Sequence, residues 1–469
     1  MKKGKIVYCV LFFAICLFPL VGLAVRPAEE STENRDLAEF PSIWTEEGLN
    51  TQWMSMAGDY FQDHFAFRRE LVTANAVLKG RLLGVSTASG VIQGTNGWLY
   101  YKDSLEDYQG TGLLPGRSIF NISHTLSMVQ EYLEGKGVAF VFAAAPNKNS
   151  LYQENMPYYY RKKASAEKNL LRLEECLWEE GVSYVDLYGV FSSQEEVLYH
   201  KRDSHWNNKG AAMAADLLLT ALGQEHDSYE AEPYEVRADF EGDLDTMLYP
   251  AMVTLEEEIY YTKEPTFAYV GEVESNFAPR IHTVNPVKGG SLVMYRDSFG
   301  NAVLPFMADA YGSAYFSRGV PYQLGDVDTM AASGVAILRA ERFLPDMAQS
   351  PPVMEGPAVV CERGMIEKAG DGALDVAMTA MGNLVKLTGR IREEYLDERT
   401  RIYLRINEAG VYEAFPMDVR LEDGTTDEGG FCLYLPAAGL RPGENTLEVA
   451  VRDQEEYHII SRHEIKEDA

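Results

Sequence analysis

The sequence predicts an α/β domain with a mostly parallel sheet flanked by helices, followed by a C-terminal β-sandwich domain. From about residue 118 to 345, short apolar runs rich in strand-forming residues alternate with longer helical patterns, which is typical of a parallel sheet. From residue 358 onward, apolar and polar residues alternate with period two between turns such as Asp423-Gly424, which is typical of a sandwich. A proline- and glycine-rich stretch at 350–357 predicts a linker between them.

The α/β pattern places its elements in a regular order. Strands are expected at 138–145, 182–187, 291–295, 314–317 and 335–340, and helices at 119–134, 164–180, 211–220 and 301–310. In the C-terminal part, strands are expected at 385–391, 401–406, 430–435 and 445–452. In a parallel sheet the functional site lies beyond the carboxyl ends of the strands.

Composition limits the function classes. A chain of 469 residues is long enough for two or three domains, and its net charge of -29 argues against nucleic acid or an anionic membrane surface as a partner. The five cysteines do not form a disulfide framework, because two lie in the apolar N-terminal segment and three are widely spaced. We expect buried free thiols.

Residues 1–25 predict an N-terminal membrane anchor. Three lysines precede a stretch from Ile6 to Val25 that carries no charge, and about 20 apolar residues suffice to span a hydrocarbon layer. The remaining chain would then lie outside the cytoplasm. A cleaved signal peptide is the alternative, since Gly22-Leu-Ala24 is a small-x-small site. Residues 26–90 predict a tether and a helical segment, and residues 91–349 the main α/β domain.

The motif around Ser298 predicts a nucleophile. Ser291 to Tyr295 is a buried strand in pattern, Asp297-Ser298-Phe299-Gly300 interrupts it, and a helical run follows. At a strand-to-helix turn a serine hydroxyl is exposed beside a helix N-terminus, which favours negative charge. The alternative is a serine that only caps the helix.

A second motif supplies the partners that such a serine needs. Asp203-Ser204-His205-Trp206 stands just before a strong helical run that Asn207 or Asn208 would cap. A serine nucleophile needs a general base, and the base needs a carboxylate that holds its tautomer. His205 would be the base and Asp203 the carboxylate. A polar loop without catalytic role is the alternative, and Asp186 is a second candidate carboxylate.

These motifs together resemble a known family. Asp203-x-His205-Trp206 followed by Asn-x-x-Gly, and Asp297-Ser298-Phe299 about ninety residues later, are similar to the DHHW family. That family resembles the alginate O-acetyltransferases of the SGNH-hydrolase-like superfamily. Further matching stretches are Asn34-Arg35-x-Leu37, Asp63-His64-Phe65, Gly97-Trp98-Leu99-Tyr100, Ala145-Pro146-Asn147-Lys148, Gly242-Asp243-Leu244 and Glu341-Arg342. The chain departs from the pattern at Ser204, where the family has His, and at Arg296, where SGNH proteins usually carry Gly.

The resemblance implies an extracytoplasmic O-acetyltransferase that moves acetyl groups onto a cell-surface or secreted polysaccharide. It implies a membrane-bound O-acyltransferase as donor partner and no cofactor. A carbohydrate acetyl esterase with the same triad is one alternative, and a non-catalytic polysaccharide-binding or assembly protein is another. No second histidine or cysteine stands at zinc-ligand spacing.

The remaining site candidates follow from their expected position at the same edge of the sheet. The Ser298 backbone N–H would hold the oxyanion together with Asn147, Lys148 or Arg296. The aromatic side chains of Tyr100, Tyr101 and Trp206 are candidates for stacking on a sugar ring.

Overall fold

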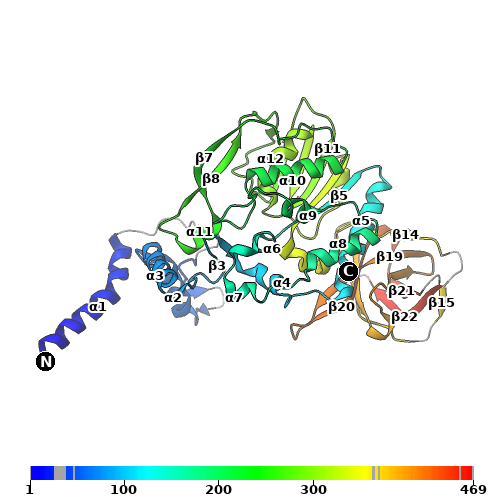
Figure 1. The fold of residues 1–469 in the computed structure, drawn as a ribbon. Helices are drawn as coiled ribbons and strands as arrows, with labels where there is room; N and C mark the ends of the chain where they lie inside the picture. Colours follow the sequence, from blue (N-terminus) through cyan, green and yellow to red (C-terminus); the bar gives the residue numbers. More distant parts are fainter. Residues whose placement is uncertain are drawn as a thin grey trace.

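The structure is a computed structural model that describes residues 2–25, 38–45, 48–361, 365–367, 370–453 and 456–466. Most of the expected tether, including the Asn34-Arg35 motif, lies outside the described residues. The first helix, α1 (Lys2–Val25), projects from the rest of the chain (Figure 1).

The predicted membrane anchor is not supported. A membrane-spanning helix needs about 20 predominantly apolar residues to cross a hydrocarbon layer of roughly 30 Å. Among the residues that the structure describes, no helix meets the combined requirement of length and apolarity for crossing a membrane. The prediction that residues 1–25 place the chain in the cell membrane is therefore wrong.

The N-terminal segment is helical, as expected, and packs on the α/β domain. Its two helices are α2 (Trp53–His64) and α3 (Arg68–Leu83). They follow the short pair β1 (Trp44–Thr45) and β2 (Gly48–Leu49) and precede the hairpin of β3 (Val91–Gln93) and β4 (Leu99–Tyr101). Ala76 of α3 shares a small core with Val91, Leu99 and Leu248.

The central sheet has seven strands in the order β6-β5-β13-β11-β12-β10-β9. The first five are mutually parallel, whereas β10 (Arg280–Val284) and β9 (Ala268–Tyr269) pair antiparallel at one edge. The predicted mostly parallel sheet is confirmed, with an antiparallel edge that was not predicted. The parallel strands are β5 (Ala139–Ala145), β6 (Tyr184–Val185), β11 (Ser291–Arg296), β12 (Ser313–Ser317) and β13 (Gly334–Ala340).

Helices cover both faces of this sheet because its strands are apolar on both sides. On one face, α10 (Asn208–Ala221) and α12 (Gly300–Ala310) pack together. On the other face lie α5 (Gly116–Glu134) and α8 (Asn169–Glu179). The shorter helices are α4 (Leu105–Gln109), α6 (Lys148–Leu151), α7 (Tyr158–Arg161), α9 (Leu187–Ser192), α11 (Asp243–Leu248), α13 (Gly325–Thr329) and α14 (Leu344–Gln349).

A hairpin that the sequence analysis did not predict is inserted between α10 and the central strands. It consists of β7 (Tyr234–Glu241) and β8 (Leu255–Tyr261), with α11 between them. The outer part of β7 is exposed. At its other end the insert returns to the main domain, where α11 contacts β3, β4 and α3.

The C-terminal domain is built of strands, as predicted. Its sheet runs in the order β15-β22-β21-β18-β19-β20-β17-β16, and β19 pairs with β18 through its first half and with β20 through its second. The two halves enclose an apolar core. The strands are β14 (Ala358–Val359), β15 (Met365–Glu367), β16 (Ala373–Met381), β17 (Leu384–Ile391), β18 (Ile402–Ile406), β19 (Gly410–Arg420), β20 (Thr426–Pro436), β21 (Glu444–Asp453) and β22 (Glu456–Lys466).

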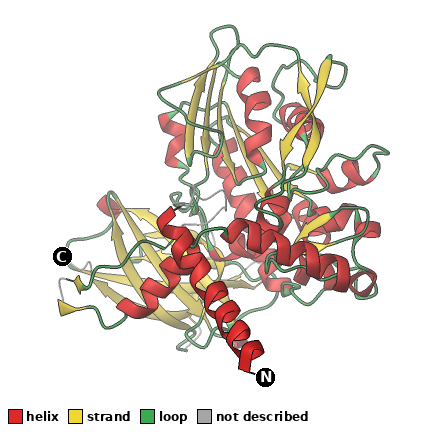
Figure 2. Ribbon diagram, turned by 90° about the vertical axis from the view of Figure 1, so that its left-hand side faces the viewer, coloured by secondary structure: helices red, strands yellow, loops and turns green. Residues whose placement is uncertain are grey.

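The two domains pack side by side (Figure 2). Phe415, Cys432 and Tyr434 of the strand domain belong to the same apolar cluster as α5 and the central sheet. Around them, Ser118 and Asn121 of α5 donate hydrogen bonds to the buried Asp418 carboxylate, at 2.6 and 2.8 Å. The expected linker at 350–357 also packs closely, since Val353 exchanges backbone hydrogen bonds with Tyr322 and Leu324.

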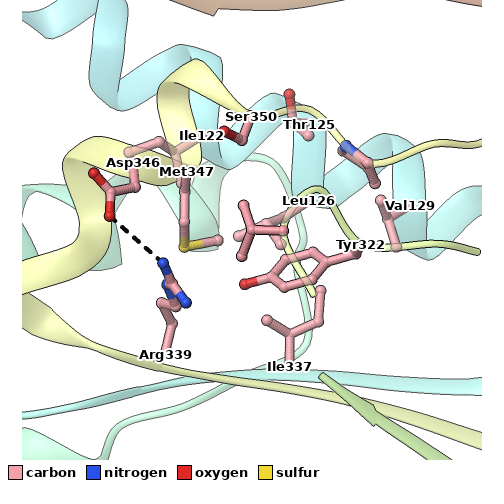
Figure 3. A pocket seen from close by; sticks show the side chains of 12 residues that line it. Ile122, Thr125, Leu126, Val129, Tyr322, Ile337, Arg339, Asp346, Met347 and Ser350 are labelled. Atoms are coloured by element: carbon pink, nitrogen blue, oxygen red, sulfur yellow. Dashed lines mark ion pairs between the residues drawn. The ribbon is translucent and has the colours of Figure 1, made fainter. Parts of the chain in front are cut away.

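A small cavity lies where α5, β13 and α14 meet (Figure 3). The side chains of Leu126, Tyr322 and Met347 line it, and the Arg339–Asp346 ion pair of 3.5 Å closes one side. Its volume is about 20 Å³, which holds little more than one water molecule. This cavity therefore does not accommodate a sugar or an acyl donor.

The described cysteines are free thiols, but the expectation of burial holds only for Cys432, since Cys9 is exposed and Cys176 and Cys361 are partly buried. Cys9, Cys176, Cys361 and Cys432 form no disulfide in the described part of the chain. Burial raises the pKa of the Cys432 thiol to about 11, so this cysteine is an unreactive core residue. The proposed segment boundaries at residues 25, 90, 349 and 358 stay predictions.

The domain interface predicts a pH-dependent stability. His124 of α5 is buried, with Nδ1 2.8 Å from Glu180 and Nε2 2.9 Å from Glu413 of the strand domain. Burial alone would lower the pKa of His124, but hydrogen bonds to the two carboxylates outweigh burial and raise it. The stabilisation is complete below the ordinary imidazole pKa of about 6.5, and it is lost as the pH rises through the raised value.

We therefore expect the free energy of unfolding to fall between pH 6 and pH 9, measured by urea denaturation. The variant His124→Gln loses this dependence and is destabilised by about 3 kcal/mol at pH 6, because two partly buried carboxylates lose their shared partner. His282→Gln is the control, since the His282 ring contacts the Ser313 hydroxyl rather than a carboxylate. An unchanged pH dependence in His124→Gln would contradict this assignment.

Candidate active site

Ser298 lies in the turn between β11 and α12, at the carboxyl edge of the sheet, where the sequence places it. Asp297 organises this turn. Its Oδ1 accepts from the Phe299 backbone N–H at 2.9 Å, and its Oδ2 accepts from the Ala340 N–H at the end of β13, at 2.6 Å. The serine turn is thereby attached to the neighbouring strand, while Ser298 itself stays partly exposed.

His205 and Asp203 approach Ser298 from the loop before α10. The Ser298 hydroxyl lies 2.8 Å from His205 Nε2, and His205 Nδ1 lies 2.7 Å from Asp203 Oδ1. Asp203 Oδ1 also accepts from the His205 backbone N–H at 2.7 Å. The structure thus brings together the three residues expected from the sequence, in hydrogen-bonded order. Asn207 caps α10 by accepting from the Gly210 N–H at 2.9 Å.

The charges of this group are strongly coupled. Burial alone would raise the pKa of Asp203, but the charge of His205 and hydrogen bonds from His205 and Asp243 hold it well below its usual range. Burial alone would lower the pKa of His205, but the charge of Asp203, its hydrogen bond and the charge of Asp243 raise it. The arrangement favours an ionised Asp203 that stabilises a protonated imidazole.

Lys148 supports the loop from beneath rather than facing a substrate. Its buried ammonium donates to the carbonyls of His200 and Lys201, each at 3.0 Å, and to the carbonyl of Asp203. Three acceptors occupy its three donors, so none is left for an oxyanion. Burial lowers the pKa of Lys148 to about 8, opposed by the charge of Asp203.

Arg296 is likewise engaged in the structure of the turn. Its buried guanidinium donates to the carbonyls of Asn276 and Ala278, at 2.9 and 3.2 Å, and to the Asn301 side chain. Gly300 makes room for it, because a Cβ there would lie 2.6 Å from the Arg296 Cβ and Cδ atoms. At the position where SGNH proteins usually carry Gly, this chain therefore has an arginine whose hydrogen bonds hold the turn in place.

Two donors remain available for an oxyanion. In the described part of the chain, the Ser298 backbone N–H has no hydrogen-bond acceptor. Asn147, only 2% exposed, has no partner for its Nδ2. It follows β5 at the same carboxyl edge, held by its own N–H to Glu341 Oε2 at 2.6 Å. Asn147 thus stays a candidate donor. The three Lys148 donors and both Arg296 Nη groups are already engaged, and the one Arg296 donor without a partner, its Nε–H, is buried.

Of the three aromatic candidates, two are buried and one is partly exposed. Tyr100 is fully buried and donates to the Tyr152 carbonyl at 2.6 Å, and Trp206 donates from Nε1 to the Phe299 carbonyl at 3.1 Å. Both are core residues, so neither ring is accessible to a sugar. Tyr101 is partly exposed. Asp186 caps α9 by accepting from the Gly189 N–H at 2.6 Å and has no place in the triad.

Two charged residues at the site were not singled out from the sequence. Asp243 lies with Oδ2 3.6 Å from His205 Nδ1. The Arg342 guanidinium lies 5.2 Å from the centre of the Phe299 ring and 5.3 Å from that of Tyr101. Both fell in stretches that matched the family resemblance, but nothing in their spacing linked them to His205.

Asp203, His205 and Asp243 are also the group whose donor atoms could approach one cation, since these atoms lie within 4.8 Å of one another. The imidazole Nδ1 already pairs with Asp203, and the Asp243 carboxylate already accepts from Ser204. Hydrogen bonding within the protein therefore accounts for the cluster.

Part of the chain is similar to a known protein family. Residues 91–267 match the family model described as the SGNH hydrolase-like domain of the acetyltransferase AlgX. The match includes Asp203 and His205 but ends before Ser298. The resemblance expected from the motifs is confirmed, whereas the expected class of enzyme, an SGNH-type O-acetyltransferase or esterase, stays a proposal.

Individual relatives are more distant. A probable alginate O-acetylase AlgJ from Pseudomonas syringae pv. tomato is 25% identical over 259 residues, which are 53% of this chain and 61% of that protein. The match therefore spans less than two thirds of the relative. A DHHW family protein from Eubacterium siraeum is 18% identical with a TM-score of 0.42, over 54% of this chain and 94% of the other.

The O-acetyltransferase domain of Pseudomonas putida AlgJ is 17% identical, with a TM-score of 0.38. The similarity covers 55% of this chain and 92% of that domain.

The position of Lys148 in the SGNH-like domain leads to a prediction. Lys148→Met leaves three carbonyls of the 200–203 loop, two of them buried, without their donor. We expect a loss of about 3 kcal/mol of unfolding free energy and a drop of roughly tenfold or more in ester hydrolysis, because the Asp203 turn is no longer held in place. Urea unfolding and turnover of p-nitrophenyl acetate measure the two effects.

Lys201→Met is the matched control, because the Lys201 side chain is exposed on the same loop. If Lys148→Met were as stable and as active as this control, the supporting role of Lys148 would be refuted.

Proposed function

We propose that this chain is an O-acetyltransferase that moves an acetyl group onto a hydroxyl of a polysaccharide through Ser298, His205 and Asp203. The observation that carries the proposal is the continuous hydrogen-bonded series from the serine hydroxyl through the imidazole to a buried carboxylate, at 2.8 and 2.7 Å. Such a series activates a serine for acyl transfer.

In the first half-reaction the Ser298 hydroxyl attacks the carbonyl carbon of an acetyl donor. His205 Nε2 takes the serine proton, and its Nδ1–H remains bonded to the Asp203 carboxylate. The Ser298 backbone N–H and the Asn147 side chain are the donors proposed for the oxyanion. When the tetrahedral intermediate collapses, the leaving group takes the proton from His205, and an acetyl ester on Ser298 remains.

In the second half-reaction a sugar hydroxyl attacks this ester. His205 Nε2 now accepts the proton of the attacking hydroxyl, and collapse of the second intermediate returns a proton to the Ser298 oxygen. The product is an O-acetylated sugar and the free serine. The fully buried Asp203 stays ionised throughout, since the positive charge that forms on His205 favours its anionic form.

The polysaccharide acceptor is part of the proposal and rests on the AlgJ relative, whose name describes it as a probable alginate O-acetylase. The charge of the chain adds a physical argument about the partner, because a protein with a net charge of -29 does not attract a polyanion through its overall field. An acceptor must therefore be recognised by short-range contacts at the site.

The proposal is tested with the full chain and p-nitrophenyl acetate as donor. Wild type is expected to release p-nitrophenol and to gain the mass of one acetyl group during turnover, detected by intact mass spectrometry. Ser298→Ala and His205→Ala are expected to lose turnover by roughly 10⁴-fold or more while remaining folded by circular dichroism. Folded variants with full activity would refute the serine mechanism.

Adding oligosaccharides separates transfer from hydrolysis. A transferase yields acetylated oligosaccharide, and the acetyl ester on Ser298 disappears faster as the acceptor concentration rises. Hydrolysis at a rate independent of every acceptor would instead assign an esterase with the same triad. A folded wild type that gives neither product nor adduct would favour a binding or assembly role.

A further inference from the structure

The inserted hairpin delivers a second acidic residue to the Asp203–Ser204–His205 turn. Gly242 stands between β7 and α11 and lies directly against the backbone of this turn, because a Cβ on Gly242 would meet the Arg202 carbonyl and would lie 3.1 Å from the Asp203 nitrogen. No larger residue fits at that position without moving the turn. Asp243 therefore begins α11 in contact with the machinery of the proposed triad.

Hydrogen bonds join the two segments in both directions. The Asp243 backbone N–H donates to Asp203 Oδ2 at 2.8 Å. In return, the Ser204 N–H donates to Asp243 Oδ1 at 2.8 Å, and the Ser204 hydroxyl donates to Asp243 Oδ2 at 2.6 Å. Each carboxylate thus accepts from the backbone of the other segment, which fixes the turn on both sides of Asp203.

Ser204 matters because it stands where the resembled family carries a histidine. Its hydroxyl lies 2.6 Å from Asp243 Oδ2 and 3.2 Å from His205 Nδ1. Since a hydroxyl has one proton to donate, the shorter distance to an anionic acceptor directs it to Asp243. His205 Nδ1–H is then left to the closer carboxylate, Asp203.

Charged groups from several elements surround His205 in the described part of the chain. Asp203 lies on its own turn, Asp243 comes from α11, and Arg342 comes from the turn after β13. Lys148 lies behind Asp203, and Tyr101 lies close to both Asp243 and Arg342. Two acidic groups and one cation therefore face the imidazole from three different elements. Burial and the charge of Asp203 raise the pKa of Asp243 itself.

We propose that Asp243 is a positioning residue of this site, which holds the Asp203–Ser204–His205 turn and adds a second negative charge beside the imidazole. This inference rests on the proposed function, since it assigns His205 as the general base. Asp243 acts through the turn and through its charge and does not touch the reacting atoms. Removing its charge makes His205 easier to deprotonate, so the base becomes neutral at lower pH.

The test compares pH–rate profiles of p-nitrophenyl acetate hydrolysis by wild type and Asp243→Asn in the full chain. As His205 must be neutral to accept the serine proton, activity rises with pH through its titration. We expect this rise to move to lower pH in Asp243→Asn, with a plateau kcat about tenfold lower because the turn is less well held. Nuclear magnetic resonance of the His205 ring is expected to show the same displacement.

Glu257→Gln is the matched control, because Glu257 is an exposed acid on β8 of the same insert. Its profile is expected to superimpose on wild type. Ser204→Ala is a second variant that keeps the carboxylate charge. It is expected to lower kcat a few-fold without moving the rise to lower pH.

Three outcomes overturn the inference. The first is that His205 titrates at the same pH in Asp243→Asn as in Glu257→Gln, whatever the change in kcat. The second is a plateau kcat in Asp243→Asn that equals that of wild type. The third is a shift of the activity rise in Ser204→Ala as large as the shift in Asp243→Asn. The resonance titration of His205 needs no turnover, so a wild type without Ser298-dependent activity would refute the proposed function and still leave the charge of Asp243 measurable.

Discussion

The buried Asp203 carboxylate is the constraint on which the site depends. With 4% of its surface exposed, it stays ionised only if protein donors replace water. One oxygen takes both the backbone and the ring N–H of His205, and the other takes the N–H of Asp243. Lys148 holds the Asp203 carbonyl from below. These donors come from separate parts of the chain, so α6, the loop before α10 and the inserted hairpin must all be in place before the imidazole can face Ser298.

The need to supply donors to buried polar groups also explains why several candidate site residues have structural roles. An irregular loop that carries a nucleophile or a base exposes backbone carbonyls that no sheet or helix satisfies, and these must find donors when buried. Lys148 and Arg296 supply them, with long side chains that reach several carbonyls at once. The indole N–H of Trp206 likewise donates to the Phe299 carbonyl. In this chain the basic and aromatic residues Lys148, Arg296 and Trp206 beside the candidate triad therefore stabilise its loops.

The C-terminal domain is bound to the SGNH-like domain more closely than the expected linker suggested. One apolar cluster includes residues of α5, the central sheet and the strand domain, and polar contacts through Asp418 and His124 surround it. Phe415 is buried in this cluster and Tyr403 in a smaller cluster of the strand domain, so neither presents a flat aromatic surface to a glycan. Burial at this interface stabilises both domains together, because each would expose apolar surface if separated.

The sequence by itself determined the order of the parallel strands and their main helices, since hydrophobic periodicity is a local property, although it did not reveal the β7–β8 hairpin or the antiparallel edge of the sheet. It also determined the three residues of the candidate triad, since Asp203 and His205 share one turn and Ser298 opens a helix after a strand. It could not determine which polar groups would be left free. Which groups are free depends on contacts between segments far apart in the chain. These contacts are the hydrogen bonds from Ser204 to Asp243, the Lys148 ammonium under the 200–203 loop, and the Arg342 guanidinium over Phe299. Only the tertiary structure brought these residues together, because the donors and acceptors that a buried loop needs are supplied by whichever elements pack against it.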